Sequence, residues 1–242
     1  MKKIIYLLII INTIGCQTAK IKNELYKVSQ AHAELGSIGE AKSKFNLDND
    51  FKIHSIPVLE SKIRLEMQLL PFNKDINKIY AAKVAAGQAQ VKINYMDSIP
   101  VKPVYATLSI ISLTDFATEL NGVQNKSVIS YLKDTKQAVV VTGVAIAFTE
   151  DDIAKLKQAD TYYLINNLDK KYNVALYKEG KRIGTIDLQS GTLLAYNLSK
   201  FCWAINDRQQ WYVGDIVKDN TSCKGNTKSR IKEKEEINLF KM

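Results

Sequence analysis

Residues 137–148, with the sequence QAVVVTGVAIAF, constrain the fold more than any other stretch of the mature chain. The run is rich in β-branched residues, carries no charge and is only twelve residues long. Such a short apolar run is typical of a strand that has no solvent-facing side. We therefore predict a central strand that is buried on both faces.

Thr149 directly follows this run and begins the next element. Threonine is a favoured N-cap, and the acidic residues 150–152 suit the first turn of a helix, where the helix dipole favours negative charge. Ile153 and Leu156 then have the spacing of a buried helix face. Together these residues predict a short amphipathic helix after the central strand.

Other stretches also have the pattern of a strand or a helix. Helices are predicted within residues 75–88 and 113–122, where apolar residues recur at helical spacing. Strands are predicted at residues 91–95 and 104–112, and the turn at residues 178–181 predicts a β-hairpin.

These elements predict an α+β fold, in which a mainly antiparallel sheet carries two or three short helices on one face. The expected order is a signal peptide (1–15), a lipidated flexible tether (16–45), a globular domain (46–223) and a polar, charged C-terminal tail (224–242). An alternative is two small α+β subdomains that meet near residues 133–137.

The first sixteen residues have the pattern of an export signal. Lys2 and Lys3 precede an apolar run at residues 4–11, which is too short to span a bilayer. Residues 13–16, TIGC, resemble the lipobox of bacterial lipoproteins, although leucine is more usual than Thr13 at the first position. An ordinary secretory signal, in which the cysteine has no role, is the alternative.

This resemblance implies a lipid anchor at Cys16. Cleavage would follow Gly15, Cys16 would carry a thioether-linked diacylglycerol, and its new amino group would be acylated. Stable membrane attachment takes two lipid signals, so three acyl chains would hold the protein firmly. Gln17 in place of aspartate implies sorting to the outer membrane.

Charge and cysteine content narrow the partners that such a chain can have. Removal of residues 1–15 lowers the net charge from +9 to about +7. In an envelope, this positive charge favours anionic lipid head groups or lipopolysaccharide over nucleic acid as neighbours. With Cys16 used for lipid, Cys202 and Cys223 remain as a pair, and we predict a disulfide between them. Neither cysteine has metal-ligand spacing to His32 or His54, so no metal site is expected.

Aromatic and acidic residues supply the candidate chemistry. Trp203, Trp211 and Tyr212 could form an aromatic surface for a glycan or protein, although aromatics in a sheet-rich segment are more often buried in the core. The acidic residues 150–152 fit helix capping better than catalysis, because consecutive helical residues do not converge. His54 lacks the neighbours of a general base.

We therefore expect a non-catalytic lipoprotein of the bacterial envelope that binds a protein or a glycan, with no cofactor and no nucleic-acid partner. Two other functions fit the same anchor. One is an envelope hydrolase that uses carboxylates from separate strands. The other is an immunity or inhibitor lipoprotein that blocks a toxin or a lytic enzyme.

Overall fold

The computed structural model of the protein describes residues 18–28, 32–41, 51–135, 137–166, 171–218 and 220–231. The expected signal peptide and the lipid site at Cys16 lie outside these residues.

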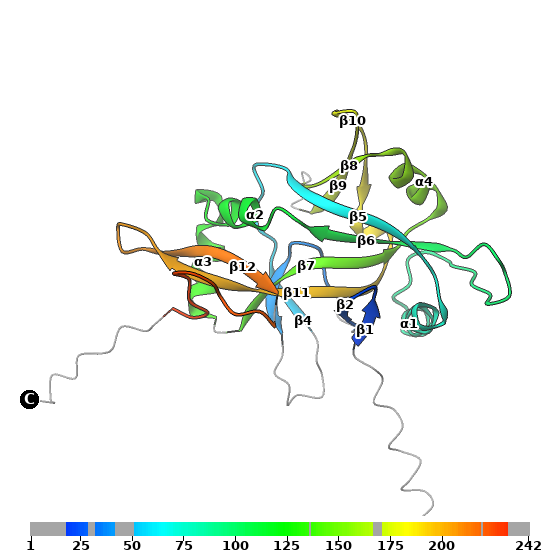
Figure 1. Ribbon diagram of the computed structural model, residues 1–242, viewed down its shortest axis with the longest axis horizontal. Coiled ribbons are helices and arrows are strands. Elements are labelled where there is room, and N and C mark those ends of the chain that lie inside the picture. The colour runs from blue at the N-terminus through cyan, green and yellow to red at the C-terminus, as the bar shows by residue number, and fades with distance from the viewer. Residues whose placement is uncertain are drawn as a thin grey trace, which may run out of the picture.

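The described part of the chain contains twelve strands, four α-helices and two short 3-10 helices (Figure 1). The strands are β1 (Thr18–Ile21), β2 (Glu24–Lys27), β3 (Ile38–Ala41), β4 (Phe51–Ser55), β5 (Ile63–Pro71), β6 (Val104–Ile110), β7 (Ala138–Ala147), β8 (Thr161–Asn166), β9 (Tyr172–Lys178), β10 (Lys181–Asp187), β11 (Thr192–Ile205) and β12 (Trp211–Lys218). The helices are α1 (Lys74–Ala85), α2 (Leu113–Leu120), η3 (Val123–Asn125), α3 (Lys126–Asp134), α4 (Glu150–Gln158) and η4 (Leu188–Ser190).

All twelve strands belong to one sheet. Its main order is β1-β2-β11-β7-β6-β5-β8-β9-β10, with β12 beside β11 and the β3–β4 pair beside β7. Every pairing is antiparallel. The predicted α+β class with a mainly antiparallel sheet is therefore confirmed. Strands from both sides of residues 133–137 share this sheet, so they do not form two separate sheets.

Strand β7 is central, as its apolar sequence predicts. It pairs with β11 on one side and with β6 and β3 on the other. Val144 and Ile146 point into the larger apolar core, whereas Ala145 and Ala147 point into a smaller core on the opposite face. The prediction that this strand is buried on both faces is confirmed.

The four helices cover both faces of the sheet, so the expectation of two or three helices on one face is wrong. Helices α2, α3 and α4 contribute Phe116, Leu132 and Leu156 to the larger core. Helix α1 packs on the other face through Ile76 and Tyr80, beside the β1–β2 hairpin (Figure 1). Alanines in β7 leave room for this second layer.

The segment expected to be a flexible tether is part of the fold in its described portions. Residues 18–28 contain the β1–β2 hairpin, and residues 32–41 contain β3. Leu35 and Ile38 are buried in the larger core, and Ile21 and Tyr26 in the smaller one. Strands of four residues bury only one or two side chains each, which is too few to produce a periodic apolar pattern.

The strand expected at residues 91–95 does not form. Side chains, and not a neighbouring strand, supply the hydrogen-bond partners of its backbone. The Thr192 hydroxyl oxygen accepts hydrogen bonds from the backbone N–H groups of Gln90 and Val91 at 2.8 and 3.2 Å. The Tyr80 hydroxyl donates to the Val91 carbonyl at 2.8 Å and accepts from the Ile93 N–H at 2.9 Å. The segment therefore packs as an ordered loop against α1.

Two local predictions are confirmed. Thr149 caps α4, because its Oγ1 accepts a hydrogen bond from the Asp152 N–H at 3.2 Å. Strands β9 and β10 form a hairpin whose two turn residues, Glu179 and Gly180, have φ angles of 50° and 76°. Positive φ at both central positions is the requirement of a type I′ turn, which glycine meets without strain.

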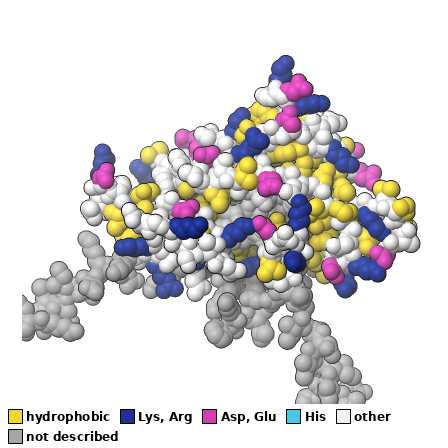
Figure 2. Space-filling view, in the orientation of Figure 1, with side chains coloured by type: hydrophobic (Ala, Val, Ile, Leu, Met, Phe, Trp, Pro, Cys, Tyr) yellow, Lys and Arg dark blue, Asp and Glu magenta, His cyan; other side chains and the backbone are white. Residues whose placement is uncertain are grey.

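Charged side chains are spread over the surface shown in Figure 2. Lysine and arginine alternate with aspartate and glutamate there and do not gather in one large area. The excess positive charge is thus not concentrated in a single patch on this face.

Alkaline pH is expected to destabilise the smaller core through Tyr105. Burial raises the pKa of this phenol to about 12 from an ordinary value of 10.0. The native state therefore holds the proton more tightly than the unfolded chain, so this contribution to stability is complete below pH 10 and is lost as pH rises toward 12. Between pH 9 and pH 11, the wild-type protein should therefore lose about 1 kcal/mol more of its free energy of unfolding than Tyr105→Phe loses.

Urea unfolding of both proteins at the two pH values measures this difference. Equal losses in wild type and Tyr105→Phe would show that Tyr105 does not contribute to alkaline destabilisation.

Candidate functional site

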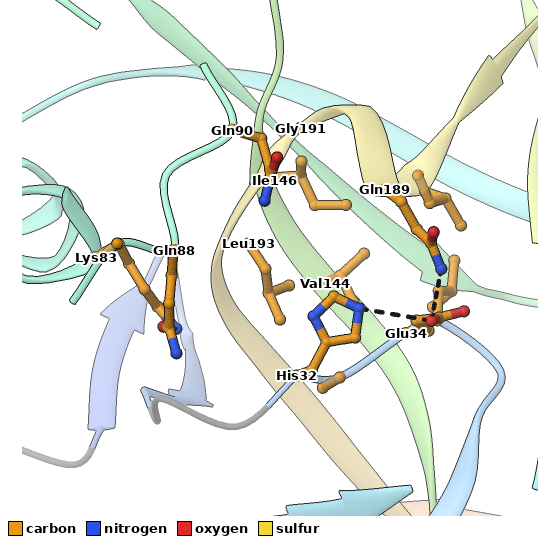
Figure 3. Close-up of a pocket in the computed structure, with 14 residues that line it drawn as sticks. His32, Glu34, Lys83, Gln88, Gln90, Val144, Ile146, Gln189, Gly191 and Leu193 are labelled. Carbon is orange, nitrogen blue, oxygen red and sulfur yellow. Dashed lines mark hydrogen bonds and ion pairs between the residues drawn. The ribbon is translucent and has the colours of Figure 1, made fainter. Parts of the chain in front are cut away.

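A pocket of about 230 Å³ lies where four segments meet at the β11 side of β7 (Figure 3). We call it the amide pocket because three glutamines, Gln88, Gln90 and Gln189, line it. The other described lining residues are His32, Ala33, Glu34, Leu35, Lys83, Gly87, Val144, Ile146, Leu188, Gly191 and Leu193.

The floor of the amide pocket is apolar. Val144 and Ile146 come from β7 and Leu193 from β11, and these two strands are hydrogen-bonded neighbours. A register shift between Leu193 and Ala195 interrupts the regular pairing of β11 with β7. The floor thus belongs to two neighbouring strands of the sheet, and the polar groups around it come from the segments that connect the elements.

Gln189 reaches the pocket from η4. The Asp187 carboxylate accepts a hydrogen bond from the Gln189 N–H at 2.8 Å and so caps this short helix. Gly191 follows, and a Cβ atom there would overlap Ile146 Cγ2 and Phe148 Cδ1. A glycine is therefore required for η4 to lie this close to β7.

Glu34 faces Gln189 from the segment that precedes β3. Gln189 Nε2 donates to Glu34 Oε1 at 2.7 Å, and His32 Nε2 lies 3.6 Å from the same oxygen (Figure 3). Two backbone bonds hold the segment on β7: Gly36 N–H donates to Val141 O at 2.7 Å, and Val141 N–H donates to Ser37 O at 3.0 Å. The carboxylate is thus placed by the sheet.

Lys83 and Gln88 lie on the other side of the amide pocket, at the end of α1 (Figure 3). Gly87 adopts a φ of 69° and reverses the chain there, and the Gln88 N–H then donates to the Lys83 carbonyl at 2.9 Å. The Lys83 side chain is buried, and its Nζ donates to Gln88 Oε1 at 3.1 Å. A cation and a carboxylate therefore lie on opposite sides of an apolar floor.

This arrangement suits recognition of a small polar molecule. A glutamine side chain offers two donors and one acceptor oxygen, so three of them can match hydroxyl or amide groups in several orientations. The apolar floor can cover the less polar side of the same ligand. Among the described residues, no three histidine, cysteine, aspartate or glutamate side chains are grouped so that they could hold a metal ion.

The possible aromatic surface does not form. Trp203 is only 5% exposed and belongs to the larger core. Trp211 is partly buried against that core, whereas Tyr212 is 38% exposed. The two residues are consecutive on β12, so their side chains point to opposite faces of the sheet. Burial in the core, the interpretation favoured for these aromatics, is correct for Trp203.

The predicted disulfide between Cys202 and Cys223 is present. Their Cα atoms are 5.7 Å apart, within the range usual for disulfides. The chain after Cys223 still contacts the sheet. The backbone of Lys228 exchanges two hydrogen bonds with the backbone of Trp203, at 2.7 and 2.8 Å. The first part of the expected tail thus contacts β11 through this bridge, while residues 232–242 lie outside the described part.

The other sequence candidates take structural positions. Asp152 belongs to the capping network of α4, since Lys155 Nζ lies 2.9 Å from its carboxylate. His54 is exposed and stacks on Tyr131, with 5.2 Å between ring centroids.

Sequence reasoning missed the amide pocket. Its polar residues come from segments that are far apart in the chain, and no spacing connects His32 and Glu34 with Lys83 or Gln189. The glycines at positions 87 and 191 were the only local indication of tight turns there.

No helix in the described part of the chain is both long and apolar enough to cross a bilayer. No family model, curated protein or solved structure matches the chain.

Proposed function

We propose that the chain is a lipid-anchored binding protein of the bacterial envelope, and that the amide pocket binds the end of a glycan. The anchor is proposed from the lipobox-like residues 13–16 and the apolar run before them. The outer membrane is the proposed location, because Gln17 follows Cys16.

One observation carries the proposed ligand: three glutamine side chains surround an apolar floor in a pocket of about 230 Å³. Pockets for drug-sized ligands usually measure roughly 300 to 1,000 Å³, so this one fits a smaller group such as a single sugar residue. A stable protein partner would instead cover roughly 800 Å² of surface. An N-acetylated sugar offers the hydroxyl and amide groups that glutamines can bind.

The hydrolase alternative has less support. Most glycoside hydrolases place two carboxylates around the scissile bond. The described residues that line the amide pocket include a single carboxylate, Glu34. The immunity or inhibitor alternative would be favoured if the purified protein blocked an envelope-degrading enzyme.

The glycan proposal predicts weak, measurable binding of N-acetylglucosamine and its disaccharide. Replacing Gln90 and Gln189 together by alanine should weaken that binding about tenfold, because each lost hydrogen bond contributes about 1 kcal/mol or less. Isothermal titration of the mature chain measures the change. Gln68→Ala is the matched control, because Gln68 lies on β5 and is not among the residues that line the pocket.

Absence of heat from either sugar with the wild-type protein would end the glycan proposal. An equal loss in Gln68→Ala would show that the sugars bind outside the amide pocket.

A further inference from the structure

Strand β1 begins only two residues after Cys16. Successive Cα atoms in a trans chain are 3.80 Å apart, so two residues span at most roughly 7 Å. Thr18 is the first residue of β1, and Ile21 at the other end of this strand is buried in the smaller core. A lipid on Cys16 would therefore have no spacer between it and the folded domain.

The β1–β2 hairpin has one inward and one outward face. Ile21 and Tyr26 point inward to the smaller core. Lys20 and Leu25 are directly opposite each other in the pairing register, so their side chains share a face. Both are exposed, and Leu25 is 66% exposed.

The outward face of the hairpin is cationic. Residues 18–28 contain three lysines and one glutamate. Lys22 occupies the turn and is exposed. Glu24 is the acidic residue of this stretch. It forms an ion pair with Lys218, and its Oε2 accepts a hydrogen bond from Asn197 Nδ2 at 3.1 Å. The carboxylate is thus engaged by the sheet, and Lys20 and Lys22 are the exposed lysines of the hairpin.

We propose that the outward face of the β1–β2 hairpin, with Lys20, Lys22 and Leu25, rests on the anionic phospholipid surface of the membrane that holds Cys16. The inference depends on the lipid anchor of the proposed function. Lysines near an anionic leaflet are attracted within a Debye length, about 8 Å at physiological ionic strength. Because Cys16 holds the start of β1 at the membrane, a hairpin that lies along the surface brings both lysines within that distance. Leu25, which is opposite Lys20 in the register, enters the apolar part of the interface.

The geometry also identifies the end of the molecule that faces away. Strands β1 and β10 are the two ends of the main sheet order, and they lie at the lower and upper sides of the molecule in Figure 1. Strand β10 carries a matched set of exposed residues: Lys181, Arg182 and Ile183. They offer similar chemistry without the short connection to Cys16.

Fluorescence quenching in vesicles tests the proposal with the lipidated full chain. Leu25→Cys and Ile183→Cys are each labelled with an environment-sensitive fluorophore and reconstituted into phosphatidylethanolamine and phosphatidylglycerol vesicles at a ratio of about 3 to 1. Spin-labelled lipid should quench the label at position 25 at least about threefold more strongly than the label at position 183. Equal quenching at the two positions would overturn the proposal.

Charge reversal provides a second test. Lys20→Glu with Lys22→Glu should lower the quenching at position 25 by at least about half, because both lysines face the anionic lipid. Lys181→Glu with Arg182→Glu should leave it unchanged. Equal effects of the two pairs would overturn the proposed contact.

Flotation separates this proposal from failure of the anchor. A chain that does not float with vesicles, or a Cys16→Ser chain that floats as well as wild type, contradicts the lipid anchor. A chain that floats through Cys16 but shows no selective quenching at position 25 keeps the anchor and contradicts the hairpin contact.

Discussion

Leu35→Ala is expected to lower the free energy of unfolding by about 3 kcal/mol. Leu35 is 1% exposed in the larger core, although it lies in the segment that the sequence presents as a tether. Removing a buried leucine side chain loses apolar contact and leaves a cavity. The neighbouring Gly36 is hydrogen-bonded to β7, which limits collapse of the segment into that cavity. Urea unfolding at equilibrium measures the loss.

Val123→Ala is the control for this prediction. Val123 is 74% exposed, so its truncation should change stability by less than about 0.5 kcal/mol. If the change in free energy of unfolding for Leu35→Ala is also below that limit, residues 32–41 do not unfold with the sheet. They would then be a tether, as the sequence predicts.

Loss of the Cys202–Cys223 disulfide is expected to cost about 3 kcal/mol. The bond joins β11 to the segment after β12 across a sequence separation of 21 residues, and it restricts the unfolded chain. Cys202 is fully buried, so alanine at both positions avoids placing a hydroxyl in the core. Urea unfolding of Cys202→Ala/Cys223→Ala against oxidised wild type measures the difference.

Reductant supplies the control for the disulfide. Dithiothreitol should destabilise the wild-type protein by a similar amount and leave the double variant unchanged. A wild-type protein that shows no response while its thiols become reactive would mean that the bond adds no stability.

The parts of the fold that could be predicted are those in which one segment contains its own evidence. Residues 137–148 are mostly apolar and uncharged, and they indicate a strand covered on both faces. Thr149 with its acidic followers indicates a helix start, and Glu179-Gly180 indicates a hairpin turn. In each case the local chemistry already excludes most alternatives.

The parts that could not be predicted depend on contacts between distant segments. Strands β1, β2 and β3 have four residues each and take their stability from cores supplied by the rest of the chain. The loop at residues 91–95 imitates a strand in sequence, but Thr192 and Tyr80 supply its hydrogen bonds. The sequence around Trp203 is compatible with either a buried or an exposed side chain, and the packing of the other elements determines which one occurs.

The candidate site was beyond sequence reasoning for the same cause. Glu34 and Gln189 form a 2.7 Å hydrogen bond across 155 positions of sequence, and neither belongs to a motif. A single sequence contains no record of such a pair.

The connection of the β1–β2 hairpin to β11 has a mechanical consequence for an anchored protein. The hairpin joins the rest of the sheet through one register pair, Lys27 with Tyr196, whereas β11 joins β7 through eight. Tension applied at Thr18 would therefore act first on the apolar contacts of Ile21 and Tyr26 and on the polar contacts of Glu24 with Lys218 and Asn197. The hairpin would separate from the sheet before β11 separated from β7. The rest of the sheet, including the end closed by the disulfide, would stay folded under a force that had already pulled the hairpin away.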